Sequence, residues 1–324
     1  MTLAPRHGQL EGMTLGRTMT LKDLTVGGKA AMAEALSVLE SAPDATQTIG
    51  LLDAAYASPR AQVVGVTGPP GVGKSTLLGA LIPKLRESGR TVGVIAVDPS
   101  SRQTGGALLG DRLRLMTDPE DNGAFVRSMA ARDRLGGLAE LTVGGMLLMR
   151  AVYDVVMIET VGVGQSETDV AWVADTVVFC VQPGSGDSLQ FMKAGIMEIP
   201  DLAVVTKSDM EAAQRTKADL RAALAHQRRG DGWSVPILPL AAQKGTGVAP
   251  LVSAIDRHGS WLAEAGRLES RRHNNAKLWF REALTTRFGR EGVKRAEMLG
   301  CRMNLDRGDA PYERLADLSA AIVD

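Results

Sequence analysis

The sequence predicts an α/β fold in which a mostly parallel sheet is covered by helices on both faces, with helical extensions at the N- and C-terminal ends. Between residues 62 and 240, short apolar runs alternate with helical stretches. Strands that are apolar along their whole length are typical of parallel sheets, because both faces of such sheets are buried. The chain of 324 residues, of which 44% are hydrophobic, is long enough to bury such a sheet in one large domain.

Helices are expected before the sheet begins. Over residues 21–57, apolar side chains such as Met32, Leu36 and Leu39 recur at three- or four-residue spacing. This period is that of one face of a helix, so two or three amphipathic helices are predicted. We assign residues 1–57 to an N-terminal helical extension, in which the first 17 residues are expected to be disordered.

Seven apolar runs are expected to form the strands of the sheet. In chain order they are QVVGVT (62–67), TVGVIAV (91–97), AFVRS (124–128), DVVMIE (154–159), TVVFCV (176–181), LAVVT (202–206) and VPILPL (235–240). Their alternation with helical segments indicates β–α units joined in one sheet. Residues 58–264 are therefore assigned to the main domain.

The strands stop after about Leu262. The segment RLESRRHNNAKLWFREALTTRF (267–288) has the pattern of a long amphipathic helix, and more helical sequence follows it. Residues 265–324 are therefore expected to form a C-terminal helical region.

Composition excludes several classes of function. The 37 basic and 37 acidic side chains cancel, so no net charge favours a nucleic acid or an anionic membrane as partner. The two cysteines and four histidines are scattered, which argues against a disulfide framework or a zinc site. No apolar run approaches the roughly 20 residues that span a bilayer, and the N-terminus lacks the apolar stretch of a secretory signal. A soluble cytoplasmic protein is expected.

The strongest local signal is GPPGVGKST (68–76), directly after the first predicted strand. It fits G-x-x-x-x-G-K-[ST] with a strand before it and a helix after it, which favours a phosphate-binding loop over a structural glycine turn. Backbone N–H groups and the helix N-terminus would attract phosphate, Lys74 would reach the β- and γ-phosphates, and Ser75 would ligate Mg²⁺. The predicted nucleotide contacts are Gly68, Pro69, Pro70, Gly71, Val72, Gly73, Lys74, Ser75 and Thr76.

Three carboxylates are expected near this loop. Asp98 ends the second strand, Asp111 lies in the loop after it, and Glu159 ends the fourth strand. Ligands of parallel sheets bind outside the carboxyl ends of the strands. Because Mg²⁺ keeps several waters and takes one or two carboxylates, at least one of the three is expected to act through water. The alternative for each residue taken alone is a cap of the following helix.

The segment TKSD (206–209) follows the sixth predicted strand and resembles the guanine-reading motif whose commonest form is Asn-Lys-x-Asp. A carboxylate at Asp209 can accept from both N1–H and the N2 amino group of guanine, a donor pair that adenine lacks. Thr206 departs from the usual Asn, and Ala241 stands where Ser is commoner. The predicted base contacts are Thr206, Lys207, Asp209, Ala241, Ala242 and Gln243. The main domain is therefore expected to be a P-loop GTPase domain.

Four further segments carry a family resemblance. They are VDPSS (97–101), TGGALLGDR (104–112), ETVGVGQSE (159–167) and PGSGD (183–187). In this order around a phosphate loop, they resemble the MeaB/ArgK family of G-protein chaperones over roughly residues 20–265. The resemblance implies a homodimeric GTPase that escorts an adenosylcobalamin-dependent acyl-CoA mutase. It also implies that the protein gates loading of intact cofactor and release of damaged cofactor, and protects the mutase from inactivation.

The resemblance also implies roles for individual residues. Lys74, Ser75, Asp98, Asp111 and Glu159 match the phosphate and magnesium positions of the family. Glycine-rich loops at 104–110 and 161–164, the second of which includes Gly162, are expected to order around the γ-phosphate of GTP and to relax when only GDP is bound.

A third switch loop, PGSGDSLQFMK (183–193), would couple the mutase to the nucleotide through Asp187, Gln190 and Lys193. Lys193 would add positive charge near the nucleotide, although a solvated lysine at the start of a helix is an equal alternative. Gln165 is a candidate for orienting the attacking water. Without the mutase, turnover is expected to be slow.

The C-terminal region is the candidate for the dimer contact that the resemblance implies. Trp279, Phe280 and Leu284 would supply it, or would equally well pack this helix on its own chain.

Two other classes share parts of the pattern. A small-molecule P-loop kinase would need the phosphate loop but not TKSD. A nickel-insertion GTPase shares the wider fold class but normally needs clustered Cys and His residues, which the sequence lacks.

Overall fold

The computed structural model describes residues 18–99, 117–131, 140–162, 169–184, 199–225 and 230–323, apart from the side chains of residues 98, 99, 130, 131 and 323. Residues 1–17, predicted to be disordered, lie outside this part of the chain.

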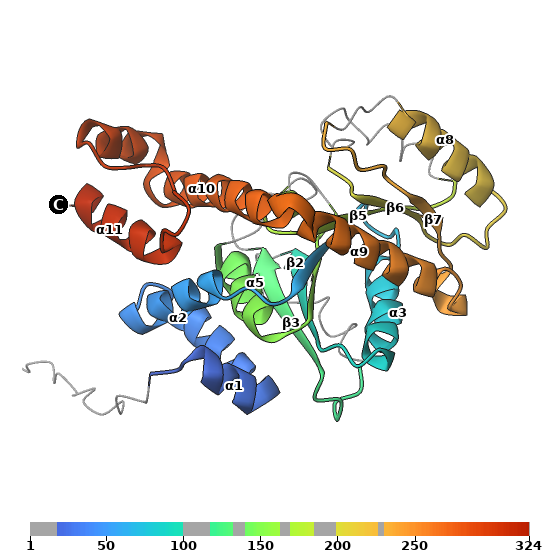
Figure 1. The fold of residues 1–324 in the computed structure, drawn as a ribbon, viewed down its shortest axis with the longest axis horizontal. Coiled ribbons are helices and arrows are strands. Elements are labelled where there is room, and N and C mark those ends of the chain that lie inside the picture. The colour runs from blue at the N-terminus through green and yellow to red at the C-terminus, as the bar shows by residue number, and fades with distance from the viewer. Residues whose placement is uncertain are drawn as a thin grey trace, which may run out of the picture.

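The described residues form a parallel sheet of seven strands in the order β3-β2-β4-β1-β5-β6-β7 (Figure 1). Its strands are β1 (Gln62–Thr67), β2 (Val92–Pro99), β3 (Ala124–Ala131), β4 (Val155–Glu159), β5 (Thr176–Val181), β6 (Leu202–Val205) and β7 (Ile237–Pro239). Each corresponds to one of the seven predicted runs. The edge strand β7 is shorter than its run because proline, present at 236 and 239, cannot donate to a strand ladder.

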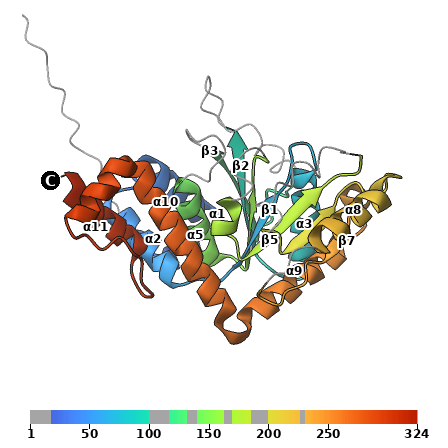
Figure 2. The same cartoon turned by 90° about the horizontal axis from the view of Figure 1, so that it is seen from above.

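Helices cover both faces of the sheet (Figure 2). Successive side chains of a strand point to opposite faces, so each strand contributes to the core on both sides of the sheet. On β1, Val63 belongs to the core formed with α1, α2, α5 and α10, whereas Val64 belongs to the core formed with α3 and α9. The helix α8 covers the far end of the first face, over Phe179 and Val205. The helices are α1 (Leu21–Ser41), α2 (Thr46–Ala57), α3 (Lys74–Glu87), α5 (Glu140–Val152), α8 (Ala213–Ala225), α9 (Val248–Ala263), α10 (Arg267–Met298) and α11 (Pro311–Val323). The predicted fold class is confirmed.

The N-terminal extension contains two helices, within the predicted two or three. Thr20 and Asp23 form a capping box that starts α1, since the side chain of each residue accepts a hydrogen bond from the backbone N–H of the other. Gly28 bends α1 at φ 59°, ψ −138°, a conformation that favours glycine. Beyond this bend, Met32 and Leu36 are fully buried against α5 and α2.

The C-terminal helices pack on the N-terminal ones. Trp279, Phe280 and Leu284 of α10 are only 7%, 1% and 1% exposed and lie in the core of their own chain. Of the two predicted roles, a dimer contact or packing on the same chain, the structure shows the packing role for these three side chains. Both oxygens of Asp53 on α2 accept first-turn N–H groups of α11, Tyr312 N at 2.9 Å and Glu313 N at 2.8 Å, which fixes α11 on α2.

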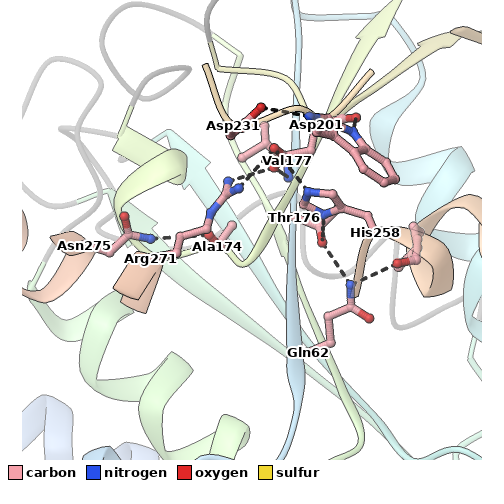
Figure 3. A network of polar contacts seen from close by, with 11 residues as sticks. Gln62, Ala174, Thr176, Val177, Asp201, Asp231, His258, Arg271 and Asn275 are labelled. Atoms are coloured by element: carbon pink, nitrogen blue, oxygen red, sulfur yellow. Dashed lines mark hydrogen bonds and ion pairs between the residues drawn. The ribbon is translucent and has the colours of Figure 1, made fainter. Parts of the chain in front are cut away.

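Two neighbouring arginines of α10 attach this helix to the edge of the sheet at which the strands begin. Arg271 donates to both carboxylate oxygens of Asp201, at 3.0 and 2.7 Å (Figure 3). Arg272 donates to Asp175 at 2.8 and 2.6 Å. These buried aspartates precede β6 and β5, and each also accepts a strand N–H at 2.8 Å. Bidentate pairs of this kind fix orientation as well as distance.

His258 of α9 joins the same network. Its Nδ1 lies 2.8 Å from the hydroxyl oxygen of Thr176, and its Nε2 lies 3.5 Å from Asp201 (Figure 3). The ring is fully buried and in contact with the rings of Trp233 and Trp261. This histidine belongs to the core. None of the helices in the described part of the chain is both long and apolar enough to cross a bilayer.

Candidate nucleotide-binding site

The loop between β1 and α3 follows a path that requires glycine. Gly68, Gly71 and Gly73 have φ values of 136°, 73° and 101°, which side chains rarely adopt. A Cβ on Gly68 would also lie 2.2 Å from the carbonyl oxygen of Cys180 on β5. In the part of the chain that the structure describes, no side chain caps α3, so its first-turn N–H groups remain for an anion.

Lys74 begins α3 and lies under the loop. Its side chain is buried, and its Nζ donates to the carbonyl oxygens of Gly68 at 2.7 Å and Pro69 at 3.0 Å. The ammonium group is thereby held at the loop, where phosphate oxygens would meet it.

Ser75 and Glu159, which the sequence predicts as magnesium ligands, are in direct contact. Ser75 Oγ donates to Glu159 Oε1 at 2.6 Å, and Glu159 is 5% exposed at the end of β4. A hydroxyl and a carboxylate are oxygen ligands of the type that Mg²⁺ binds, so these residues fit the ion. On the neighbouring strand β2, Ala96 pairs with Glu159, which places the backbone of Asp98 just beyond this level. The Asp98 side chain is not among those described.

Gly162, in the loop after β4, crosses directly over the phosphate loop. Its φ is 82°, and a Cβ there would lie 2.3 Å from the Gly68 carbonyl oxygen and 2.4 Å from Lys74 Nζ. Only glycine permits this approach. The structure thus brings the predicted residue Gly162 next to Lys74.

A cavity of about 250 Å³ lies beside the phosphate loop. It is lined by Val72, Gly73, Thr76, Thr206, Lys207, Asp209, Met210, Leu240, Ala241, Ala242, Gln243 and Lys244. All six predicted base contacts are among them, together with three residues of the predicted phosphate loop. The two halves of the predicted site therefore share one cavity.

Thr206 holds the two halves of the site together. Its buried hydroxyl oxygen lies 2.8 Å from the carbonyl oxygen of Val72 and 3.0 Å from that of Val181, and the hydroxyl proton is shared between these two acceptors. Because a hydroxyl has one proton, and this proton is used within the protein, Thr206 has no proton left to donate to a bound base. Lys207 makes a second link: its Nζ donates to Gly71 O at 3.2 Å and to the side chain of Gln182 at 2.6 Å.

Asp209 lies at the exposed side of the cavity and forms an ion pair with Lys244 at 2.9 Å. The hydrogen bond from Lys244 holds the pKa of Asp209 below its usual range, so the carboxylate is ionised and can accept hydrogen bonds at neutral pH. Sequence reasoning did not single out Lys244, although it directly follows Gln243 in the segment assigned to the base. The segment is closed by the backbone pair of Ala241 and Thr246, at 2.9 and 3.2 Å.

Three predicted catalytic residues cannot be placed. Asp111, Gln165 and Lys193 lie outside the described residues, as do Asp187 and Gln190 of the third switch loop. Among the residues that are described, no three His, Cys, Asp or Glu side chains cluster in a way that would hold a metal ion. A magnesium ion at Ser75 and Glu159 would therefore need ligands from water, phosphate or the remaining residues.

The central strand of the parallel sheet leads into a phosphate loop and a helix, and residues that follow β6 line the same cavity as this loop. This arrangement defines a P-loop NTPase. More particularly, the chain belongs to the MeaB family, since the profile described as "Methylmalonyl Co-A mutase-associated GTPase MeaB" matches residues 32–295. The family resemblance is confirmed.

Individual relatives agree with this family. Proteins from Pyrococcus horikoshii and Mycobacterium tuberculosis, both named as GTPases, are 43% and 39% identical over 257 and 261 residues; the matches cover 78% of this chain in each case and 80% and 78% of those proteins. The mouse mitochondrial "Methylmalonic aciduria type A homolog" is 35% identical over 274 residues, covering 79% of this chain and 66% of that protein. A crystal structure titled "LAO/AO transport system kinase" is similar with a TM-score of 0.66 and 28% identity, covering 94% of this chain and 96% of that one.

Proposed function

We propose that this protein binds GTP with Mg²⁺, hydrolyses it to GDP and phosphate, and acts as a chaperone of an adenosylcobalamin-dependent acyl-CoA mutase. In this role it would gate loading and release of the mutase cofactor and protect the mutase from inactivation. The description of its family, which names association with methylmalonyl-CoA mutase, supports this partner.

One observation carries the nucleotide part of the proposal. The phosphate loop and Asp209 line the same cavity, since its lining includes Val72 and Gly73 as well as Asp209. A nucleotide with its phosphates on the loop would therefore place its base near a carboxylate. That carboxylate accepts from guanine but finds no matching donor pair on adenine.

The chain's residues would divide the chemistry between binding and positioning. Residues 68–76 would surround the β- and γ-phosphates, with Lys74 donating to them. Ser75 and Glu159 would hold Mg²⁺, joined by Asp98 and Asp111 from the adjoining segments. When bound, Mg²⁺ neutralises charge on the phosphate oxygens.

Hydrolysis also needs a positioned water and stabilisation of developing charge. We propose Gln165 for the first role and Lys193 for the second, with Asp187 and Gln190 coupling this loop to the mutase. Because positioning and electrostatics supply most of the rate in P-loop enzymes, completion of the site by the partner would accelerate a slow basal reaction.

We further propose a homodimer formed through residues 265–324. Trp279, Phe280 and Leu284 are buried within the chain, so other side chains of this region would make the contact. On α10 and just beyond it, Leu278, Met298 and Leu299 are apolar and 48%, 81% and 57% exposed. The boundaries at residues 57 and 264 between this region, the GTPase domain and the N-terminal extension stay predictions.

A two-part experiment tests the proposal. Titration with GTP and ATP in the presence of Mg²⁺ should show tighter binding of GTP, and tighter binding of ATP would overturn the guanine assignment. The protein is then incubated with methylmalonyl-CoA mutase and with other B12-dependent acyl-CoA mutases. Faster phosphate release and a complex with one of them are expected, and the chaperone role is wrong if neither occurs with any of them.

A small-molecule kinase is the second candidate, because the similar crystal structure is titled as a transport system kinase. A kinase transfers the γ-phosphoryl group to an acceptor, whereas a GTPase releases inorganic phosphate. Labelled GTP distinguishes the two: we expect all label in inorganic phosphate, and label in any other small molecule would favour the kinase.

A further inference from the structure

A second cavity, of about 550 Å³, lies at the opposite edge of the sheet from the phosphate loop. It is lined by Tyr56, Ala57, Pro59, Arg150, Leu268, Glu269, Arg272, His273, Arg307 and Gly308. These residues come from the end of α2 and the segment after it, from α5, from the first turns of α10 and from the segment before α11. The backbone of Arg150 accepts hydrogen bonds from Arg60 and Ala61, which lead into β1, so the six residues of that strand, roughly 20 Å, separate this cavity from the phosphate loop.

Arg150 is the unusual residue of this cavity. It is only 5% exposed, yet within the described residues its Nε has no hydrogen-bond partner and its Nη2 makes a single long contact of 3.4 Å, to the carbonyl oxygen of Tyr56. Its guanidinium carbon lies 5.9 Å from the centre of the Tyr56 ring. No carboxylate in the described part of the chain forms an ion pair with it. Buried arginines are normally paired, because an unpaired charge is costly to remove from water.

The surroundings of Arg150 are positive. Arg272 is already paired with Asp175, which balances its charge, whereas the one side-chain contact of exposed Arg307 with other described residues is a 3.3 Å hydrogen bond to the hydroxyl of Ser270. Among the described residues that line the cavity, Glu269 is the one acidic side chain, while Asp175, outside the lining, also attracts Arg150.

The acid–base properties of two lining residues agree with this excess of positive charge. Burial, and then the nearby Arg272, lower the pKa of Arg150 to about 10. Burial, together with Lys277 and Arg307, lowers the pKa of His273 below its usual value, against the smaller opposing effects of Asp306 and Asp309. Both groups would hold their protons more strongly beside an anion.

We propose that this cavity binds a small phosphorylated organic molecule, with its phosphoryl group between Arg150 and Arg307 and its apolar part against Tyr56, Pro59 and Leu268. The planar guanidinium group bonds phosphate oxygens in pairs, and a dianion balances two cations. The volume lies within the range of roughly 300 to 1,000 Å³ that is usual for small-molecule sites. Glu269 accepts from hydroxyl or amino groups of the ligand.

A purely structural account of Arg150 is available and makes a different prediction. Arg150 is in the last turn of α5, where a cation interacts favourably with the helix dipole. If this were its whole role, Arg150→Met would lower the melting temperature of the protein. If Arg150 is retained for a ligand, removal of the unpaired buried charge leaves the melting temperature unchanged or raises it, and abolishes the response to the ligand.

The test uses the full chain with its nucleotide site saturated by GDP and Mg²⁺, at constant ionic strength. Phenyl phosphate is the probe, compared with inorganic phosphate and benzoate by calorimetry and thermal shift. Phenyl phosphate should bind most tightly, since it alone combines a dianion with an apolar group. Lys74→Ala, which alters the phosphate loop, should bind the probe with the same affinity as the wild type. Loss of nucleotide binding is thereby distinguished from loss of probe binding in the second cavity.

Two arginine variants locate the binding. Arg307→Ala should weaken phenyl phosphate binding by about tenfold or more, as expected for loss of a charge-assisted hydrogen bond. Arg281→Ala, an exposed arginine further along α10, should leave it unchanged. Absence of phenyl phosphate binding at millimolar concentrations would overturn the proposal, as would equal affinity in the wild type and Arg307→Ala, or a lower melting temperature of Arg150→Met with an intact response to the probe.

Discussion

Ser75 and Glu159 meet at the carboxyl edge of the sheet, where Ser75 Oγ donates a 2.6 Å hydrogen bond to Glu159 Oε1. Eighty-four positions separate them in the sequence, and the pairing of β1 with β4 brings them together. This contact joins the start of α3 to the end of β4, the two segments that a bound triphosphate and its cation would touch.

The first prediction concerns this pair. Glu159→Gln keeps the shape of the side chain but removes its charge, so GTP turnover should fall by about 10- to 100-fold and need more Mg²⁺, while GDP affinity changes little. Phosphate release measured over a Mg²⁺ titration tests this. Glu87→Gln, at the far end of α3, is the control. Unchanged turnover in Glu159→Gln would exclude a role for this carboxylate.

The second prediction uses two glycines with nearly equal φ angles, Gly162 and Gly89. In Gly162→Ala, the new methyl group would collide with Gly68 and Lys74, so nucleotide affinity should fall by about 10- to 100-fold through displacement of the lysine. In Gly89→Ala, φ is 79° and no atom of the described residues would lie within 4 Å of the new Cβ, so only backbone strain of about 1 kcal/mol is expected. Calorimetric titration with GDP compares the two. Equal affinities would show that Gly162 does not shape the phosphate site.

The third prediction tests base recognition. Asp209→Asn should weaken GDP binding by about 10- to 100-fold, because an amide cannot accept from both guanine donors. The same variant should gain affinity for xanthosine diphosphate, whose C2 carbonyl accepts from the new amide. Lys244→Ala should change GDP affinity by less than about fivefold, since exposed ion pairs contribute little. Displacement of a fluorescent GDP derivative measures all three, and a variant that loses GDP without gaining the xanthine nucleotide would argue against direct contact with the base.

The fourth prediction is a pH dependence. The Arg86 guanidinium donates to both oxygens of Asp121, at 2.8 to 3.1 Å, and holds the pKa of that carboxyl below its usual value. A carboxyl with a lowered folded-state pKa stabilises the protein above its unfolded pKa, and this stabilisation is lost as pH falls through the folded value. Asp121→Asn should therefore reduce the free energy of unfolding by about 1 kcal/mol at pH 7.

The deficit of Asp121→Asn relative to the wild type should shrink below about pH 4, where the wild-type carboxyl is protonated too. Urea denaturation across pH measures this difference. Asp219→Asn, at an exposed position of α8, should match the wild type throughout. A deficit of constant size at every pH would mean that the charge of Asp121 is not its source.

The sequence was informative wherever the signal is local. The strands and the phosphate loop follow from apolar runs and glycine spacing within a few residues, and the base segment follows from its place after β6. Contacts between distant segments could not be predicted in this way. The Thr206 hydroxyl bonds Val72 across 134 positions, and only the packed structure shows that it links the two halves of the site. Equally, the amphipathic pattern of α10 does not tell whether Trp279 faces its own chain or another.

The arginine pair on α10 has a mechanical consequence. Arg271 forms an ion pair with Asp201, the residue that directly precedes β6. Thr206 and Lys207 of the base segment directly follow the other end of this strand. Only the four residues of β6 lie between. A displacement of the C-terminal helices would therefore be transmitted through β6 to Thr206 and Lys207, which line the base cavity. The C-terminal helices are rigidly attached to the sheet through this contact.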